Sequence, residues 1–297
     1  MVKNRSLWIT LFILPCMALF AFIYAAPIIT VAVTAFTKYT AFKPPTFTGL
    51  SNFKTIFSDA DFLISIRNTV WWVFLQSTFH VGLGLAVALM LRRKPKGWKV
   101  LRSAYLIPNI IPTAATGVMF MLLFNPSFGV IRDIFTRLGI GGSVLNLFGN
   151  SKYAFWTVTA TWIFYSAFNT IIFLAEINAI DRQIYESASI VGAAPWQSDR
   201  YITLPLMRNV IGTCVVLASV AMVSQFDIIY MTTKGGPGTA TLNLPIYLYK
   251  AATLETNYGK ANAVGVIQII LGISLVLLIQ RLFRSREKVK SNREAFL

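Results

Sequence analysis

The sequence is poor in the residues from which most active sites and metal sites are built. Its 297 residues include one histidine, two cysteines and 11 acidic residues, and charged residues make up only 13% of the chain. The short motifs that hold phosphates, zinc or a serine nucleophile (GxxxxGK[ST], HExxH and GxSxG) do not occur. We therefore expect no enzyme, no catalytic residues, and no metal or cofactor bound by the chain itself.

Long apolar segments make up most of the chain instead. Hydrophobic residues account for 56% of the sequence, whereas soluble proteins contain about 45–50% apolar residues. A hydrocarbon core of roughly 30 Å requires about 20 apolar residues per crossing, and each crossing must be helical because lipid offers the backbone no hydrogen-bond partner. We predict an all-α integral membrane protein with six transmembrane helices, at about 8–36, 69–91, 103–124, 153–176, 209–232 and 263–283.

Basic residues are concentrated in a few of the segments outside these helices. Lys and Arg number 27 against 11 Asp and Glu, which gives a formal net charge of +16. Most of the basic residues lie near the two termini or within segments 92–102 and 177–208, and such residues concentrate on the cytoplasmic side of membrane proteins. We place both termini and both segments in the cytoplasm, and expect membrane lipid, rather than nucleic acid, to contact the basic segment 92–102.

Polar side chains within the predicted helices are costly in lipid and therefore mark candidate functional positions. His80 is isolated from other polar groups, so we interpret it as a packed histidine that bonds to a neighbouring helix. Glu176 and Asp227 lie near the ends of their predicted helices. No proton relay at the midplane is therefore expected.

Aromatic and amide side chains occur together on the predicted helices 153–176 and 209–232. Trp162, Tyr165 and Asn169 recur at helical spacing and would share one face. Aromatic rings stack on the C–H faces of sugars and amides bond their hydroxyls, but Asn169 and Gln225 are equally compatible with bonds that hold helices together. The candidate substrate path comprises Trp162, Tyr165, Asn169, Ser224, Gln225 and Asp227.

The cytoplasmic segment between predicted helices four and five carries its own start and stop signals for helices. Asp181 is placed as an N-cap, residues 182–191 favour a helix, and Gly192 can end it in the left-handed conformation. Pro195 suits the first turn of a second short helix, and Pro205 is expected to break that helix before the next transmembrane segment. We predict a helix, a turn and a helix, with small side chains that let a protein partner approach closely.

The same segment resembles a known family signature. Glu186, Ser187 and Ala188 are followed by three residues and Gly192, and after nine more residues by ITLP at 202–205. This pattern resembles the E-A-A-x-x-x-G, nine residues, I-x-L-P signature of the permease subunits of binding-protein-dependent ABC importers. Ser187 departs from it but keeps the small size, and residues 226–252 are similar to sugar permeases of the maltose and glycerol-phosphate type.

The resemblance implies a type I ABC importer permease fold, with residues 1–297 as one permease domain in the bacterial plasma membrane. It also implies partners: a second, often non-identical permease subunit, two cytoplasmic ATPase subunits that bind ATP and magnesium, and an extracytoplasmic sugar-binding protein. The cargo would be a sugar, with an oligosaccharide favoured. The residues that would couple to the ATPase are Glu186, Ser187, Ala188, Gly192, Leu204 and Pro205.

Two other classes of function fit the sequence less well than an importer subunit does. An independent secondary solute transporter would require coupling carboxylates or cation sites near the midplane and usually shows inverted repeats, and neither is visible in the sequence. An intramembrane enzyme would require a catalytic constellation, which is absent from the sequence. An importer subunit is therefore the favoured prediction, with the secondary transporter as the alternative.

Overall fold

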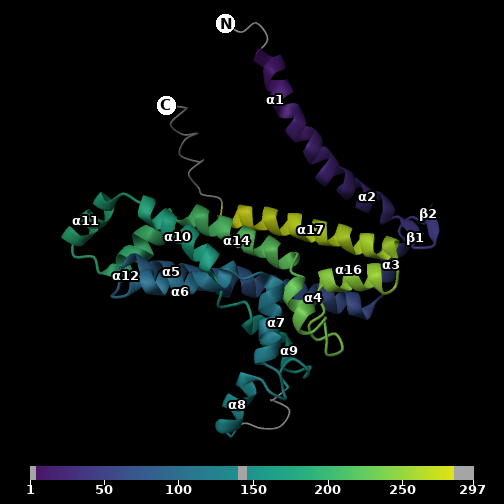
Figure 1. The fold of residues 1–297 in the computed structure, drawn as a ribbon. Coiled ribbons are helices and arrows are strands. Elements are labelled where there is room, and N and C mark those ends of the chain that lie inside the picture. The colour runs from purple at the N-terminus through teal and green to yellow at the C-terminus, as the bar shows by residue number, and fades with distance from the viewer. Residues whose placement is uncertain (1–4, 140–145, 284–297) are drawn as a thin grey trace. The chain divides into compact units, whose positions relative to one another are not determined.

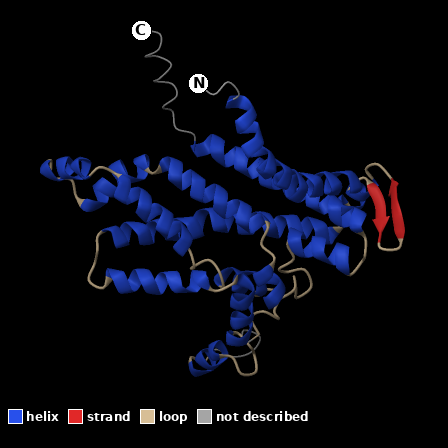
Figure 2. Ribbon diagram, turned by 45° about the horizontal axis from the view of Figure 1, so that its top comes forward, coloured by secondary structure: helices blue, strands red, loops and turns tan. Residues whose placement is uncertain are grey.

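The computed structural model describes residues 5–139 and 146–283, and helices dominate it (Figure 2). The chain forms two compact units, Met1–Leu63 with Tyr247–Ile270 and Ile64–Ile246 with Leu271–Leu297.

The first unit begins with a long apolar helical segment. Its stretch Ile9–Thr34 is long and apolar enough to cross a membrane. The elements of this unit are α1 (Arg5–Phe20), a π-helical turn (Ala21–Ala25), α2 (Ala26–Thr34), β1 (Thr37–Thr40), β2 (Lys43–Phe47), α3 (Ser51–Phe57), the start of α4 (Ala60–Leu75), most of α16 (Leu244–Thr253) and the first half of α17 (Tyr258–Phe283).

The antiparallel hairpin formed by β1 and β2 departs from the all-α prediction. Pro44 and Pro45 in β2 are incompatible with a helix interior, and the threonines of β1 favour an extended backbone. Asn52 secures the base of the hairpin, because its Nδ2 donates to the carbonyl oxygens of Ala35 and Thr37, both at 2.8 Å. The first helix consequently ends before the predicted boundary at residue 36.

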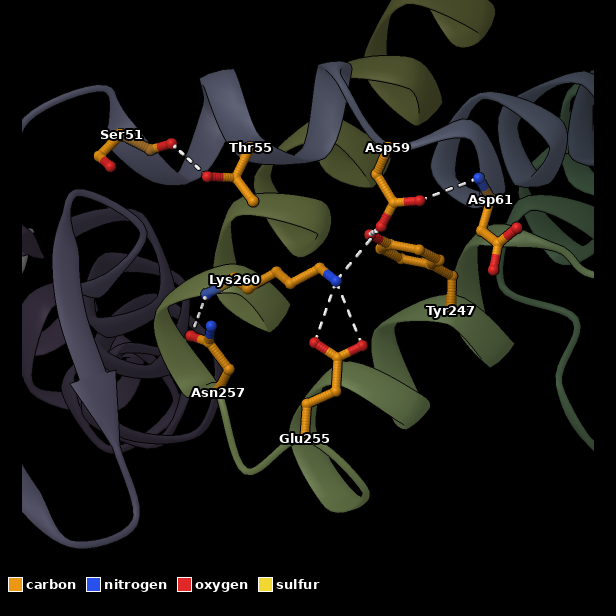
Figure 3. A network of polar contacts seen from close by, with 8 residues as sticks. All are labelled: Ser51, Thr55, Asp59, Asp61, Tyr247, Glu255, Asn257 and Lys260. Atoms are coloured by element: carbon orange, nitrogen blue, oxygen red, sulfur yellow. Dashed lines mark hydrogen bonds and ion pairs between the residues drawn. The ribbon is translucent and has the colours of Figure 1, made fainter.

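A polar network around Lys260 joins α16 and α17 to the turn before α4 (Figure 3). Lys260 Nζ lies 3.0 Å from Glu255 Oε2 and 3.4 Å from Asp59 Oδ2, and the Tyr247 hydroxyl donates to Asp59 Oδ2 at 2.6 Å. Burial raises the pKa of Asp59, but hydrogen bonds from Tyr247 and from the Asp61 N–H, together with the Lys260 charge, outweigh that effect and hold this pKa below its ordinary value.

The second unit contains the remaining helices. These are the end of α4 with a π-helical turn (Gln76–His80), α5 (Val81–Arg92), α6 (Trp98–Leu106) with a 3-10 turn (Ile107–Ile110), α7 (Thr113–Leu123), α8 (Val130–Arg137), α9 (Ala154–Ala160), α10 (Ala167–Ala179), α11 (Arg182–Ile190), α12 (Pro195–Ser198), a π-helical turn (Asp199–Thr203), α13 (Leu204–Leu206), α14 (Arg208–Val223), α15 (Asp227–Thr232) and the end of α17.

Three of the segments predicted as single helices are interrupted in the structure. The segment 103–124 is bent by 99° between the 3-10 turn after α6 and the helix α7, where Pro108 and Pro112 remove backbone donors. The segment 153–176 is irregular between α9 and α10, and 209–232 is interrupted between α14 and α15. Irregular backbone at membrane depth is tolerated where protein or a cavity satisfies its polar groups.

Among the described residues, three helices are long and apolar enough to cross a membrane, and two bent pairs would raise the number to five. The three are Ile9–Thr34, Ala60–Arg92 and Tyr258–Phe283. The predicted number of six crossings and the predicted sides of the termini stay predictions.

Close packing of α5 against α10 forms part of the core of the second unit. A Cβ on Gly84 would lie 2.9 Å from Asn169 Cβ and 3.2 Å from Ser166 O, so α5 has no room for a side chain there. Thr170 Oγ1 donates to Gly84 O at 3.1 Å across the same contact. Tight contacts at small residues are typical of membrane helix pairs. Around them lies an apolar cluster of Val81, Ala88, Phe173, Ile177, Met207, Cys214 and Ala218.

His80 is a packed histidine, as the sequence predicted. Its Nδ1 lies 3.1 Å from Ile163 O, and the side chain is buried. The partner belongs to the irregular segment between α9 and α10 rather than to a helix. The histidine therefore provides a hydrogen-bond partner for a backbone carbonyl that lies outside any helix.

Candidate functional site

A cavity of about 290 Å³ lies within the second unit, and we refer to it as the Tyr165 cavity. Its wall combines the π-helical turn after α4, the bend between α6 and α7, the irregular segment before α10, and α14. All three interruptions described above thus contribute to this wall, because Gln225 lies in the break between α14 and α15. The breaks in the helices and the cavity have the same location because backbone freed from a helix needs partners away from lipid.

Four of the six predicted substrate-path residues line the Tyr165 cavity. They are Trp162, Tyr165, Asn169 and Gln225. The helical spacing used to group the first three was wrong, since residues 161–166 do not form a helix. These side chains reach one cavity because the chain turns between α9 and α10, and not because they share a helix face.

The other two predicted residues, Ser224 and Asp227, are exposed and do not line the cavity. Asp227 begins the short helix α15 instead of lying far along one continuous helix, which corrects its predicted place. Its Oδ2 accepts a hydrogen bond of 2.9 Å from Thr113 Oγ1, and Thr113 is itself part of the cavity wall. Asp227 therefore contacts the wall from outside.

The sequence pattern did not predict two polar residues of the cavity wall, Gln76 and Asn109. Gln76 Oε1 is buried and has no hydrogen-bond partner in the described part of the chain. The Asn109 amide fits between Tyr165 O and Phe168 N, at 3.1 Å from each, with its oxygen toward the Phe168 N–H. A buried acceptor without a partner is costly, and the Gln76 oxygen is covered by neighbouring atoms rather than exposed in the cavity. The prolines on either side of Asn109 were the one available signal.

The segment 181–205 forms the predicted helix, turn and helix at one end of α5, α10 and α14 (Figure 1). Asp181 caps α11 by accepting a 2.9 Å hydrogen bond from Gln183 N. Gly192 has φ of +80°, a conformation that favours glycine and reverses the chain before α12. The second helix is broken before α14, as expected: it continues through the π-helical turn and α13, which contains Pro205, and the chain then bends by 70° between Leu206 and Arg208.

The turn of the 181–205 segment exposes several apolar side chains. Ile190 is 85% exposed and Val191 82% exposed, beside exposed Trp196 and Tyr201. A hollow of about 470 Å³ lies at this turn, and its wall includes Ala188, Gly192 and Tyr201. Clustered apolar side chains on an exposed turn indicate a surface that binds another protein.

The six predicted coupling residues occupy two places in this segment. Glu186, Ser187 and Ala188 lie on α11, and Gly192 forms the turn after it, whereas Leu204 and Pro205 lie in α13 at the junction with α14. Glu186 pairs with Arg182 at 2.8 Å within the same exposed helix. The first four residues therefore lie on α11 and in the turn after it, and the last two lie at the junction with α14.

Residues 80–289 match the family model described as "Binding-protein-dependent transport system inner membrane component". The match covers most of the second unit, including the 181–205 segment. This chain belongs to that family. It is a multi-pass permease component of the inner membrane, as the resemblance in segment 181–205 predicted.

Individual relatives agree with the family assignment. The chain is 30% identical over 273 residues to a probable ABC transporter permease protein of Pyrococcus horikoshii, covering 91% of this chain and 93% of the relative. It is 32% identical over 241 residues to the trehalose/maltose transport system permease protein MalF of Thermococcus litoralis, covering 81% of each.

A solved structure shows that the fold is that of an ABC importer permease. The chain matches a bacterial alginate ABC transporter, crystallised in complex with an alginate pentasaccharide-bound periplasmic protein, with a TM-score of 0.83. The match covers 95% of both chains at 22% sequence identity.

Proposed function

We propose that this chain is one of two permease subunits in an ATP-driven, binding-protein-dependent sugar importer of the bacterial plasma membrane. The Tyr165 cavity carries the proposal, because three aromatic rings and four amide side chains line one space. Aromatic faces and amides are the groups that bind the C–H faces and hydroxyls of a sugar. The names of two matched proteins, a trehalose/maltose permease and an alginate importer, support an oligosaccharide as the cargo.

The size of the cavity supports a path that is shared with a second subunit. Its volume of about 290 Å³ is at the lower end of small-molecule sites, which span roughly 300–1,000 Å³. An oligosaccharide needs more room than this. We infer that a second, non-identical permease subunit of the same type I fold provides the opposite wall, and that each subunit contributes six transmembrane helices.

The 181–205 segment is proposed to dock on a cytoplasmic ATPase. Its exposed turn at Gly192 presents apolar side chains of the kind that fill a cleft on a partner, and α10 and α14 lead from its two ends toward the cavity. Two ATPase subunits that bind ATP and magnesium would move this segment as they close, and so shift the pathway between two states. Both termini and the basic segment 92–102, which would contact anionic lipid, would lie on the same side, with a sugar-binding protein on the other.

Co-purification and ATPase measurements test this proposal. The chain is expressed with candidate second permease and ATPase subunits, purified, and mixed with a candidate binding protein with or without its sugar. We expect the ATPase to co-purify and its activity to rise only with the sugar-loaded binding protein. A preparation in which the loaded binding protein leaves ATP hydrolysis unchanged would contradict the proposal.

A further inference from the structure

Arg92, the last residue of α5, contacts both arms of the 181–205 segment. Its Nη1 donates to Asp199 Oδ1 at 2.8 Å and to Thr203 Oγ1 at 3.0 Å. Its guanidinium carbon lies 4.0 Å from the centre of the Tyr185 ring, and the hydroxyls of Tyr185 and Thr203 are 3.0 Å apart. Tyr185 belongs to α11, and the other two residues belong to the turn after α12. We refer to Arg92, Tyr185, Asp199 and Thr203 as the Arg92 cluster.

The Arg92 cluster is shielded from water, which strengthens its contacts. Thr203 is fully buried, and the side chains of Arg92 and Asp199 are 22% and 13% exposed. Charge-assisted hydrogen bonds in such surroundings hold more firmly than surface ion pairs. The nearby Arg182–Glu186 pair is a contrast, because its side chains are 90% and 58% exposed and it lies within a single helix. Exposed pairs of that kind contribute little.

The cluster attaches the segment to α5, in addition to the chain connections at its two ends, and Arg93, the residue after α5, pairs with Asp199 at the same place. The chain itself joins the segment to α10 before Asp181 and to α14 after Met207. A body held at two points can still rotate about the line between them. A third contact, to a different helix, restricts that rotation, so α5 has to follow the movement of the segment.

From Arg92 the chain leads back to the wall of the Tyr165 cavity. α5 continues without a break into the π-helical turn that holds Gln76 and His80, and both residues line the cavity. At 1.5 Å per residue, the distance from Gln76 to Arg92 is about 24 Å. Along this length Gly84 touches Asn169 so closely that α5 cannot shift without a response from α10.

We infer that Arg92 is a positioning residue for transport, which ties the 181–205 segment to α5 and thereby passes its movement to the Gln76 and His80 side of the cavity. The inference rests on the proposed function, because it requires the segment to be moved by a partner ATPase. It assigns to α5 a role that the two covalent attachments at α10 and α14 cannot supply.

The test compares R92M with R182M in the complete complex with its partner permease, ATPase and binding protein, reconstituted in vesicles. R92M removes the guanidinium that bonds Asp199 and Thr203 and lies over the Tyr185 ring, whereas R182M removes an arginine of the same segment whose ion pair lies within α11. For R92M we expect unchanged ATPase association, because the exposed turn at Gly192 is untouched, and about a tenfold loss of sugar imported per ATP hydrolysed. R182M should keep the wild-type ratio.

A second pair of variants is available in case R92M does not insert. T203V removes only the hydroxyl that Arg92 and Tyr185 bond, at nearly constant volume, and T203S keeps it. We expect T203V to lower the ratio of sugar imported to ATP hydrolysed and T203S to restore it. A wild-type ratio in T203V would overturn the role of the cluster.

The outcomes separate this inference from the proposed function. If the proposed function is wrong, the wild-type complex itself shows no ATP-dependent import. If only the inference is wrong, the wild type couples import to ATP hydrolysis and R92M imports as much sugar per ATP. Loss of ATPase association in R92M would also overturn the inference, because Arg92 would then shape the docking surface instead of passing on its movement.

Discussion

The 181–205 segment and the Tyr165 cavity present opposite chemistry at two places in one unit. The turn of the segment exposes Ile190 and Val191 by more than four-fifths. The cavity has the amides of Asn109 and Asn169 in its wall together with aromatic rings. Exposed apolar side chains are typical of surfaces that bind proteins, whereas amides beside aromatic rings suit a small polyhydroxylated solute. With two separate sites, a protein partner can bind at the segment while the transported solute binds in the cavity.

The largest expected effect comes from G192L in the segment. A leucine at φ +80° is strained, and its bulk lies on the exposed turn, so ATPase association should fall by more than about tenfold. G97L is the matched control, because Gly97 has φ +81° and open space around it but lies outside the segment. Pull-down of the ATPase measures both variants. Equal association of G192L and wild type would remove the docking role of this turn.

Substitution of two amides in the wall tests whether the cavity binds the transported sugar. In N169A/Q225A, sugar uptake should fall about tenfold, as expected for the loss of roughly 1.4 kcal/mol of binding, while basal ATP hydrolysis stays near wild type. S224A and D227N alter predicted path residues that lie outside the lining and should take up sugar normally. Uptake and basal ATPase are measured on the same vesicles. If both activities fall together in N169A/Q225A, these amides hold helices together rather than bind cargo.

Packing between the two regions is tested by G84A against G82A. The new Cβ at position 84 would meet Asn169 Cβ at 2.9 Å, and such overpacking costs about 1–3 kcal/mol. Position 82 on the same helix has nothing within 4 Å, so alanine there should leave stability unchanged or raise it by up to about 1 kcal/mol. Thermal unfolding in detergent reports both. Equal melting temperatures for the two variants would contradict the close contact of α5 and α10.

The smallest effect concerns the other unit and its pH dependence. Because the pKa of Asp59 is lowered in the folded state, its contribution to stability is present above its unfolded pKa of about 3.9 and is lost as pH falls through the folded value. Unfolding temperatures measured from pH 7 downward should therefore drop less steeply below about pH 4 in D59N than in wild type. D61N, at the exposed neighbouring position, should retain the wild-type profile. Identical profiles for D59N and wild type would show that the Lys260 network does not stabilise the unit.

The sequence predicted the 181–205 segment far better than the cavity, for a physical reason. The cap at Asp181 and the left-handed turn at Gly192 are set by residues within a few positions of each other, so local rules suffice. The cavity depends on contacts distant in sequence, such as His80 with Ile163 and Asn109 with Tyr165. No glycine or proline marks the break at residues 161–166, so the pattern gave no warning of it.

The prolines at 108 and 112 are an intermediate case. They lie within an apolar run whose composition predicts one helix, and their effect, a bend of 99°, follows from the missing backbone donors. Attention to them would have predicted the bend and exposed Asn109 as a wall residue. Pro44 and Pro45, which follow the first apolar run, likewise indicate that the chain is not helical where the hairpin of β1 and β2 forms.

Sugar uptake by the reconstituted complex tests the central claim most directly. Vesicles that contain this chain, its partner permease and the ATPase are supplied with binding protein and a radiolabelled oligosaccharide, with ATP inside or absent. We expect labelled sugar to accumulate only when ATP and the binding protein are both present. Accumulation by vesicles that contain this chain alone, without ATP, would show an independent transporter and contradict the account.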